Sequence, residues 1–429
     1  MLREGDDMKA LQGVKVLDFS RVLAGPYCTL LLADMGAEVI KVEKPGSGDD
    51  TRLFGPYQNG ESGYFALLNR GKQSIEADLK DPEDIAFITE LIKEADVIVE
   101  NFRPGVMERV GFGYDKVKEL NPGIVYASIS GFGQYGPYRE RPAYDLVAQA
   151  MGGMTSITGH PENPPTRTGS SLGDMSAALY AAYGIMVALF HKQRTGEGQY
   201  IDVAMVDTIF AMLETNVLRY TMQNEVPGRI GSRHPISTPF DIYKVQDGYL
   251  VIAIANNPLF EKLCHALGMP ELITDERFST DSLRTDNEMA LKHIIETHFA
   301  KKTVAQAEAL LAHHGIPCSK INTIQDIVIV PIDFNKMAVL LGTSLQNRKK
   351  EYELHYIELA TLCKDYILQK TSYSVTIGIG QFYDDARNLQ VSFQEALAAQ
   401  DYKLFNGSNS VVHFASIKAN QREPCRTSN

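Results

Sequence analysis

The segment VKVLDFSRVLAGPYCTLLLADMGAEVIKVE (residues 14–43) decides the fold class of this chain. It begins with the short apolar run VKVLDF, turns through SRVLAGP into an apolar-periodic segment, and ends with the second apolar run EVIKVE, a pattern that predicts strand, loop, helix and strand. The pattern recurs with a predicted helix at 84–95, a strand at 95–102 and another strand at 123–133. Repeated units of this kind with near-continuous apolar strands predict an α/β fold with a parallel sheet covered on both faces.

The alternation of predicted strands and helices continues to about residue 225, after which a second domain is predicted. Residues 173–198 predict one long helix with a glycine-rich stop, residues 199–207 a strand, and the following segment a helix to about Gln223. From about residue 226 one strand (DGYLVIAIAN) and three helical segments (LFEKLCHALG, EMALKHIIETHFA and AQAEALLAHHG) predict a separate small α/β domain.

Composition excludes several classes of function. The chain has 429 residues, 42 Lys plus Arg and 53 Asp plus Glu, and a net charge of −11, with no basic run that would bind nucleic acid or an anionic membrane. Its five cysteines form no CxxC pair, so neither a disulfide framework nor a metal site is predicted. The first residues lack a secretory signal, and the apolar segment 177–191 is too short to span a bilayer. We therefore expect a reduced, cytoplasmic protein.

The first predicted loop superficially resembles a dinucleotide-binding turn. Its sequence SRVLAGP contains no GxGxxG pattern, and Arg21 stands where a close-packed glycine would be needed. We therefore rank nicotinamide binding below a different nucleotide-bearing ligand. Asp18 and Glu43 at the ends of the two strands are interpreted as capping or pairing groups rather than as ribose contacts.

Three long segments carry a specific resemblance to a known family. Residues 11–52, 99–138 (VENFRPGVMERVGFGYDKVKELNPGIVYASISGFGQYGPY) and 173–205 (GDMSAALYAAYGIMVALFHKQRTGEGQYIDVAM) strongly resemble the class III CoA-transferases, the formyl-CoA transferase family, in unbroken order over residues 11–327. The resemblance implies a Rossmann-like large domain (1–225), a small domain (226–327) and a homodimer of two interlinked ring-shaped chains. It implies acyl-CoA and a carboxylic acid as substrates, with no permanently bound cofactor.

The resemblance also implies that Asp174, in the GD pair at the start of the long helix, is the nucleophile. A carboxylate that attacks an acyl-CoA thioester forms a mixed anhydride, the released CoA thiolate converts the anhydride into an aspartyl-CoA thioester, and a second carboxylic acid accepts the CoA. The helix dipole favours an ionised carboxylate at this position, and nearby glycine amides could stabilise the oxyanion. On spacing alone, Asp174 would be interpreted as a helix cap.

The positions that contact CoA in the family can be transferred residue by residue. They lie in the first loop, after the second strand, in the SIEADLK segment, in the ENFRPG turn and in a later loop. The residues concerned are Leu23, Ala24, Lys44, Ala77, Asp78, Leu79, Lys80, Asn101, Phe102, Arg103, Arg109, Arg141 and Tyr144. Arg21 occupies a position that varies in the family and is included as a candidate with an open role. The cations in this set suit the phosphates, and Phe102 suits an adenine or pantetheine face.

Alternatives within the same family stay open at this point. The α-methylacyl-CoA racemases resemble the chain throughout the same region, but they carry a histidine base where this chain has Tyr144, and a tyrosine is a poor base at neutral pH. His234 is a substitute base in principle, although a loop histidine before proline is more often structural. Members of the family that use oxalate carry a run of glycines that closes over the active site, and this chain has no such run. Dicarboxylates such as succinate and longer organic acids are both reasonable substrates.

The resemblance ends after residue 327. Residues 328–417 are instead similar to the degenerate GGDEF-like, nucleotide-cyclase-related domain that precedes the DNA-binding helices of AraC-type response regulators, which predicts an atypical α+β module, and 418–429 predicts an unstructured tail. The chain is then either a genuine fusion, acting as a regulatory or interaction protein, or an incomplete transferase joined to foreign sequence. Loss of the usual return segment should expose apolar surface on the large domain.

Overall fold

The computed structural model describes residues 9–324, 327–333 and 336–341, together with short stretches between residues 360 and 413. The chain divides into two compact units, Met1–Ile242 with Ala253–Lys292 and Tyr243–Ile252 with His293–Asn429. The predicted domain boundaries at 225/226 and 327/328 stay predictions.

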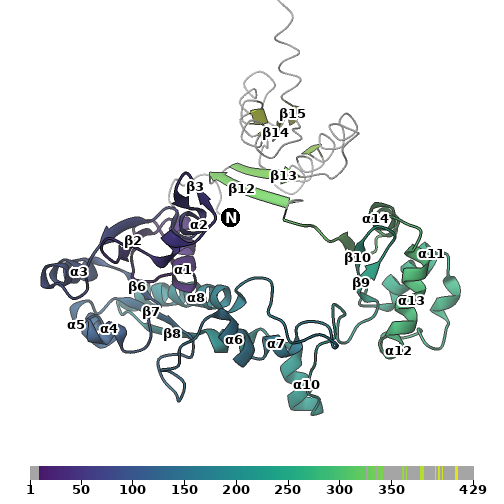
Figure 1. Cartoon of the computed structure of the whole chain (residues 1–429), viewed down its shortest axis with the longest axis horizontal. Coiled ribbons are helices and arrows are strands. Elements are labelled where there is room, and N and C mark those ends of the chain that lie inside the picture. Colours follow the sequence, from purple (N-terminus) through teal and green to yellow (C-terminus); the bar gives the residue numbers. More distant parts are fainter. Residues whose placement is uncertain are drawn as a thin grey trace, which may run out of the picture. The chain divides into compact units, whose positions relative to one another are not determined.

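A six-stranded parallel sheet forms the centre of the first unit (Figure 1). In spatial order its strands are β5 (Gln73–Glu76), β2 (Glu38–Glu43), β1 (Lys15–Asp18), β6 (Val97–Glu100), β7 (Val125–Ser130) and β8 (Tyr200–Ala204). This is the order of dinucleotide-binding folds, and it reverses direction between β1 and β6. The predicted parallel α/β fold is therefore confirmed.

Both faces of the sheet are buried. Alternate side chains of a strand point to opposite faces, so Val16 and Leu17 of β1 belong to different clusters. The cluster around Val16 includes small residues of α1 (Ala24–Asp34) and α8 (Leu172–Thr195). The cluster around Leu17 includes Ile88 of α3 (Pro82–Glu94) and Val117 of α5 (Tyr114–Leu120). The apolar strands thus pack between two layers of helices.

The connections of this unit contain helices, a 3-10 turn and a short hairpin. They are α1 (Ala24–Asp34), η1 (Asp50–Leu53), β3 (Tyr57–Gln58), β4 (Glu61–Ser62), α2 (Gly63–Asn69), α3 (Pro82–Glu94), α4 (Val106–Arg109), α5 (Tyr114–Leu120), α6 (Asp145–Met151), α7 (Met154–Ile157), α8 (Leu172–Thr195), α9 (Met205–Ala211) and α10 (Thr215–Gln223). Helix α3 confirms the prediction for 84–95; Asp81 caps it by accepting the N–H groups of Glu83 and Asp84.

The long helix α8 confirms the prediction for 173–198 and ends at Gly196, which adopts the left-handed conformation. It has 24 residues and is long and apolar enough to cross a membrane by length and composition. The prediction from segment 177–191 that this helix is too short to span a bilayer is therefore wrong, because the helix extends beyond that segment at both ends. Its small residues nevertheless pack in the core cluster around Val16, as expected for a core helix of a globular unit.

Two predicted boundaries differ from the structure. The strand expected over 199–207 ends at Ala204, and Met205 already begins α9, because periodicity alone does not separate a short apolar strand from a buried helix. The single helix expected to about Gln223 is interrupted before α10, where Glu214 has a φ of 49°. A non-glycine residue in that conformation cannot continue a right-handed helix.

The region after residue 240 contains a three-stranded sheet of order β11-β10-β9 and several helices. The elements are β9 (Phe240–Lys244), β10 (Tyr249–Ala253), α11 (Asn257–Leu267), η2 (Pro270–Ile273), α12 (Asp281–Asp286), α13 (Glu288–Phe299), α14 (Val304–His313) and β11 (Cys318–Lys320). They confirm the strand and the three helices predicted here.

Part of the predicted C-terminal module 328–417 lies within the described residues. Strand β12 (Ile327–Asp333) pairs antiparallel with β13 (Lys336–Leu341), and β14 (Ile377–Ile379) pairs parallel with β15 (Val411–His413). Strands β13 and β14 lie in the apolar segments KMAVLLG (336–342) and SVTIGIG (374–380). Most of this module and the whole tail 418–429 lie outside the described residues, so the likeness to a GGDEF-like domain stays a prediction.

Candidate active site

The loop after β1 and the turn after β6 meet where the strand order reverses. The backbone N–H of Arg21 donates to Oδ1 of Asn101, and Nδ2 of Asn101 donates back to the carbonyl of Arg21, both at 2.8 Å. The Arg21 guanidinium lies 5.8 Å from the ring centroid of Phe102. Open parallel sheets bind ligands at this reversal, outside the carboxyl ends of the strands. The structure therefore brings predicted site residues from two distant segments together at the expected edge.

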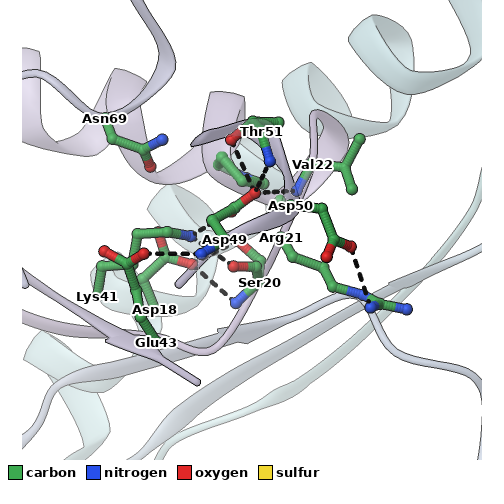
Figure 2. A network of polar contacts seen from close by, with 12 residues as sticks. Asp18, Ser20, Arg21, Val22, Lys41, Glu43, Asp49, Asp50, Thr51 and Asn69 are labelled. Atoms are coloured by element: carbon green, nitrogen blue, oxygen red, sulfur yellow. Dashed lines mark hydrogen bonds and ion pairs between the residues drawn. The ribbon is translucent and has the colours of Figure 1, made fainter. Parts of the chain in front are cut away.

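A buried pair of charges holds the loop after β1 (Figure 2). The ammonium group of Lys41 lies 2.9 Å from a carboxylate oxygen of Asp49 and donates to the carbonyl of Ser20 at 2.6 Å. The other oxygen of Asp49 accepts the N–H of Val22 at 3.3 Å. Val22 has a φ of 67°, a costly conformation for a β-branched residue. The buried pair therefore supports a strained loop that leads directly to Leu23 and Ala24.

The strand-end acids Asp18 and Glu43 are fully engaged with protein groups. Burial alone would raise the pKa of Asp18, but Lys72 at 3.0 Å and the nearby Lys41 lower it to about 2. Burial would also raise the pKa of Glu43, but hydrogen bonds from Arg52 and Ser74 lower it to about 2. Both acids therefore pair with cations, as was interpreted from the sequence.

The SIEADLK segment and helix α4 border a common surface pocket. The pocket has a volume of about 550 Å³ and is lined by Leu79, Lys80, Ile85, Val106, Arg109 and Val110. Ala77 is buried and donates its N–H to the carbonyl of Glu43, whereas Asp78 binds the N–H of Lys80 with its own carboxylate. The structure thus brings Lys80 and Arg109 together. Lys44 and Arg103 are exposed at the carboxyl ends of β2 and β6.

Asp174 is the third residue of α8 and not its cap. The helix begins at Leu172, its N-cap position is Ser171, and the described part of the chain provides no side-chain capping bond there. The dipole was expected to favour the ionised form, but burial, followed by the negative charge of Asp145, raises the pKa of Asp174 to about 6. Burial and the charge of Asp145 therefore outweigh the stabilisation of the ionised form by the helix dipole. A carboxylate with this pKa is still mainly ionised at pH 7.

Asp145 and Gln149 complete the environment of Asp174, and neither residue was predicted from the sequence. One oxygen of the buried Asp145 accepts the N–H of Gly173 at 2.7 Å, and both oxygens accept from Nε2 of Gln149 at 3.0 and 2.8 Å. The side-chain oxygen Oε1 of Gln149 accepts the N–H of Thr168 at 3.0 Å. Asp145 follows directly after the predicted site residue Tyr144, which was the available signal. These contacts attach the start of α8 to α6.

A third missed residue is Tyr64 in α2. Burial, and after it the negative charges of Asp174 and Asp49, raise the pKa of this phenol. Tyr64 therefore lies within electrostatic reach of both Asp174 and the loop-supporting pair. No sequence pattern marked it, because YFALLN is an ordinary amphipathic segment.

The predicted site residues Arg141 and Tyr144 lie in the exposed segment that leads into α6. The Arg141 guanidinium lies 4.8 Å from the ring centroid of Tyr138, and 79% of Tyr144 is exposed. His234 stacks on Phe240 with ring centroids 4.9 Å apart and accepts the N–H of Ile236, as expected for a structural loop histidine. In the parts of the chain that the structure describes, no group of three or more His, Cys, Asp or Glu side chains could hold a metal ion.

Comparisons with known proteins identify the family of the chain. The family model of CoA-transferase family III matches residues 11–337. The chain is 43% identical over 320 residues to an acetyl-CoA:oxalate CoA-transferase of Acetobacter aceti, covering 74% of this chain and 82% of that protein. It is 42% identical over 323 residues to a succinyl-CoA:glutarate CoA-transferase of Mus musculus, covering 75% and 74%.

Solved structures give the same result. A crystal structure of a CAIB/BAIF family protein from Brucella suis superposes with a TM-score of 0.67 at 36% identity, covering 81% of this chain and 99% of that one. Because the family model spans most of the chain and these relatives are 36% to 43% identical to it over the aligned regions, the chain belongs to CoA-transferase family III.

Proposed function

We propose that the protein transfers CoA from an acyl-CoA donor to a carboxylic acid through covalent intermediates on Asp174. The observation that carries the proposal is the environment of this carboxylate. It lies at the start of α8, its pKa is raised to about 6, and among the described residues it forms no hydrogen bond or ion pair. A partly desolvated carboxylate that is still ionised at neutral pH has the properties of a nucleophile.

The reaction proceeds in balanced steps. The Asp174 carboxylate attacks the thioester carbonyl, the C–S bond breaks, and a mixed anhydride and CoA thiolate form. The thiolate attacks the aspartyl carbonyl of the anhydride and releases the donor acid as its carboxylate. The acceptor carboxylate then attacks the aspartyl-CoA thioester, and the CoA thiolate released again attacks the acceptor carbonyl of the second anhydride. This last step forms the new acyl-CoA and regenerates the Asp174 carboxylate.

We place CoA along the edge where the strand order reverses. Leu23 and Ala24 begin α1 there, Asn101 and Phe102 follow β6, and Lys80 lies in the pocket with Arg109. The helix N-terminus and the cations suit the phosphates of CoA. The other residues of the proposed set are Arg21, Lys44, Ala77, Asp78, Leu79, Arg103, Arg141 and Tyr144.

We propose dicarboxylic acids as the class of acid carried. The two relatives described above are named for oxalate, succinyl-CoA and glutarate, and another relative, from Chloroflexus aurantiacus, is named for succinyl-CoA and D-citramalate. Apart from the acetyl group, which the name of the first relative also gives, each of these acids carries two carboxylates. Transfer is favoured over proton exchange at the α-carbon, because Tyr144 is exposed and His234 is engaged in its own loop.

We also propose that the protein acts as a homodimer. Leu179, Tyr183, Val187 and Phe190 form one exposed apolar stripe along α8, with 69% of Tyr183 and 60% of Phe190 exposed. A second copy that covers this stripe would remove it from water. Light scattering should give twice the chain mass for the wild type and a monomer for Tyr183→Lys; a monomeric wild type would mean that the stripe is simply uncovered.

Intact-mass spectrometry tests the catalytic proposal. The protein is incubated with succinyl-CoA without acceptor, and we expect an adduct of CoA on the wild type and none on Asp174→Asn. Addition of glutarate should remove the adduct and release glutaryl-CoA. The proposal is wrong if the wild type forms no adduct, or if the variant forms the same one.

A further inference from the structure

Arg167 lies in the segment that leads into α8 and is attached to the surroundings of Asp174. Thr168, the next residue, donates its N–H at 3.0 Å and its hydroxyl at 3.2 Å to the side-chain oxygen Oε1 of Gln149. The Gln149 side chain is fully buried. Gln149 in turn binds Asp145. The backbone at Arg167 is therefore fixed to the same buried groups that hold the start of α8.

The guanidinium of Arg167 is close to this acidic centre but weakly bonded. Its Nη1 atom lies 3.9 Å from an oxygen of Asp145, beyond hydrogen-bond distance, and half of its side chain is exposed. In the described part of the chain its single hydrogen bond is a long one, from Nη2 to the carbonyl of Gly169 at 3.4 Å. Most of its donors are therefore available to a ligand.

The charge balance shows what this guanidinium is suited to bind. Asp145 and Asp174 place two carboxylates close enough for the first to raise the pKa of the second. Among the described residues Arg167 is the cation that reaches Asp145, and none forms an ion pair with Asp174. A substrate with a second carboxylate would be repelled by the two acids unless a cation compensated. An arginine fork binds a carboxylate with two parallel hydrogen bonds.

We propose that Arg167 binds the distal carboxylate of a dicarboxylic substrate while the other carboxyl group reacts at Asp174. This inference rests on the proposed function and deepens it, because it assigns selection for dicarboxylates to one side chain. Arg167 is then a specificity residue and takes no part in the transfer of CoA itself.

Succinyl-CoA and butyryl-CoA form a matched pair of probes. They share CoA and a four-carbon acyl chain and differ in the distal group, which is a carboxylate in one and a methyl group in the other. We compare the concentration of each that gives half-maximal CoA adduct on the wild type, Arg167→Gln, Arg167→Lys and the control Arg194→Gln, an exposed arginine near the other end of α8. Thermal unfolding and binding of free CoA are measured in parallel.

We expect Arg167→Gln to raise the half-saturating concentration of succinyl-CoA roughly 10- to 100-fold, the loss for a charge-assisted hydrogen-bonded pair. Butyryl-CoA, unfolding and free CoA binding should stay unchanged, Arg167→Lys should recover part of the loss, and Arg194→Gln should match the wild type. Equal losses for both acyl-CoAs, or no loss, would overturn the assignment while leaving CoA transfer intact. A wild type that forms no adduct with either probe would overturn the proposed function itself, and this assignment with it.

Discussion

Replacing Asp174 by asparagine should stabilise the folded protein at pH 8 much more than at pH 4. Burial, and then the charge of Asp145, raise the pKa of this carboxyl from 3.8 to about 6 on folding. Below the lower value both the folded and unfolded states hold the proton, so the carboxyl costs nothing. As pH rises toward the higher value the unfolded chain loses its proton first, so stability falls; above about 6 the whole cost is present.

The size of the effect follows from the same shift. A difference of about 2 pKa units corresponds to about 3 kcal/mol at pH 8, and to roughly half of that at pH 5. Asp174 is only partly buried, and solvent screening reduces the cost, so we expect about 1–3 kcal/mol. Asparagine has nearly the same shape and no charge, and it removes the cost at every pH.

Urea unfolding of the wild type and Asp174→Asn at pH 4, 5 and 8 measures this difference. The free-energy gain of the variant should grow with pH, whereas the control Asp115→Asn, at an exposed position of α5, should show no such growth. A gain that is the same at all three pH values, or one that decreases with pH, would refute the reasoning. It would show that the folded protein does not disfavour the ionised carboxyl.

Three further changes test other parts of the site and the fold. Asp145→Asn should lower the apparent pKa for adduct formation by less than about one unit, because burial is the larger cause of the shift; an unchanged pH profile would contradict this. Arg284→Met should cost about 3–5 kcal/mol in urea unfolding, because this fully buried guanidinium binds two backbone carbonyls, and a loss below 1 kcal/mol would be inconsistent with that role. Gly25→Ala should weaken CoA binding in calorimetry, because the added methyl group would lie 2.1 Å from Cβ of Ser20, whereas Gly228→Ala, in open space, should bind like the wild type.

The sequence predicted the fold well because its information is local. Apolar runs with β-branched residues identify strands such as β6, and glycine after a periodic segment identifies the end of α8 at Gly196. The spatial order of the strands could not be predicted in the same way, because periodicity does not specify which strands pair. The break at Glu214 was missed for a related reason, since no glycine or proline marks it.

The sequence predicted those contacts of the candidate site that follow from the type of a residue and its place in a strand. Asp18 and Glu43 end two apolar strands, and their pairing with cations follows from the cost of burying a charge. Asp145 could not be placed in this way, because its contact with Gly173 joins residues 28 positions apart and depends on how α6 packs on α8. The raised pKa of Asp174 was missed for the same reason, because it depends in part on the charge of Asp145.

The contact between Asp145 and Gly173 bears on the proposed role of Asp174 as a nucleophile at a helix start. An acid in the first turn normally binds the free N–H groups of that turn, which lowers its pKa and weakens it as a nucleophile. Here the N–H of Gly173 is already bound by Asp145, whose negative charge also raises the pKa of the neighbouring Asp174. One buried acid thus removes a competing hydrogen bond from the proposed nucleophile and increases its basicity, while a pKa of about 6 keeps Asp174 ionised at neutral pH. If this is correct, Asp145→Asn should slow formation of the CoA adduct at pH 7 even though the nucleophile becomes more fully ionised, and a faster reaction would show that ionisation alone is limiting.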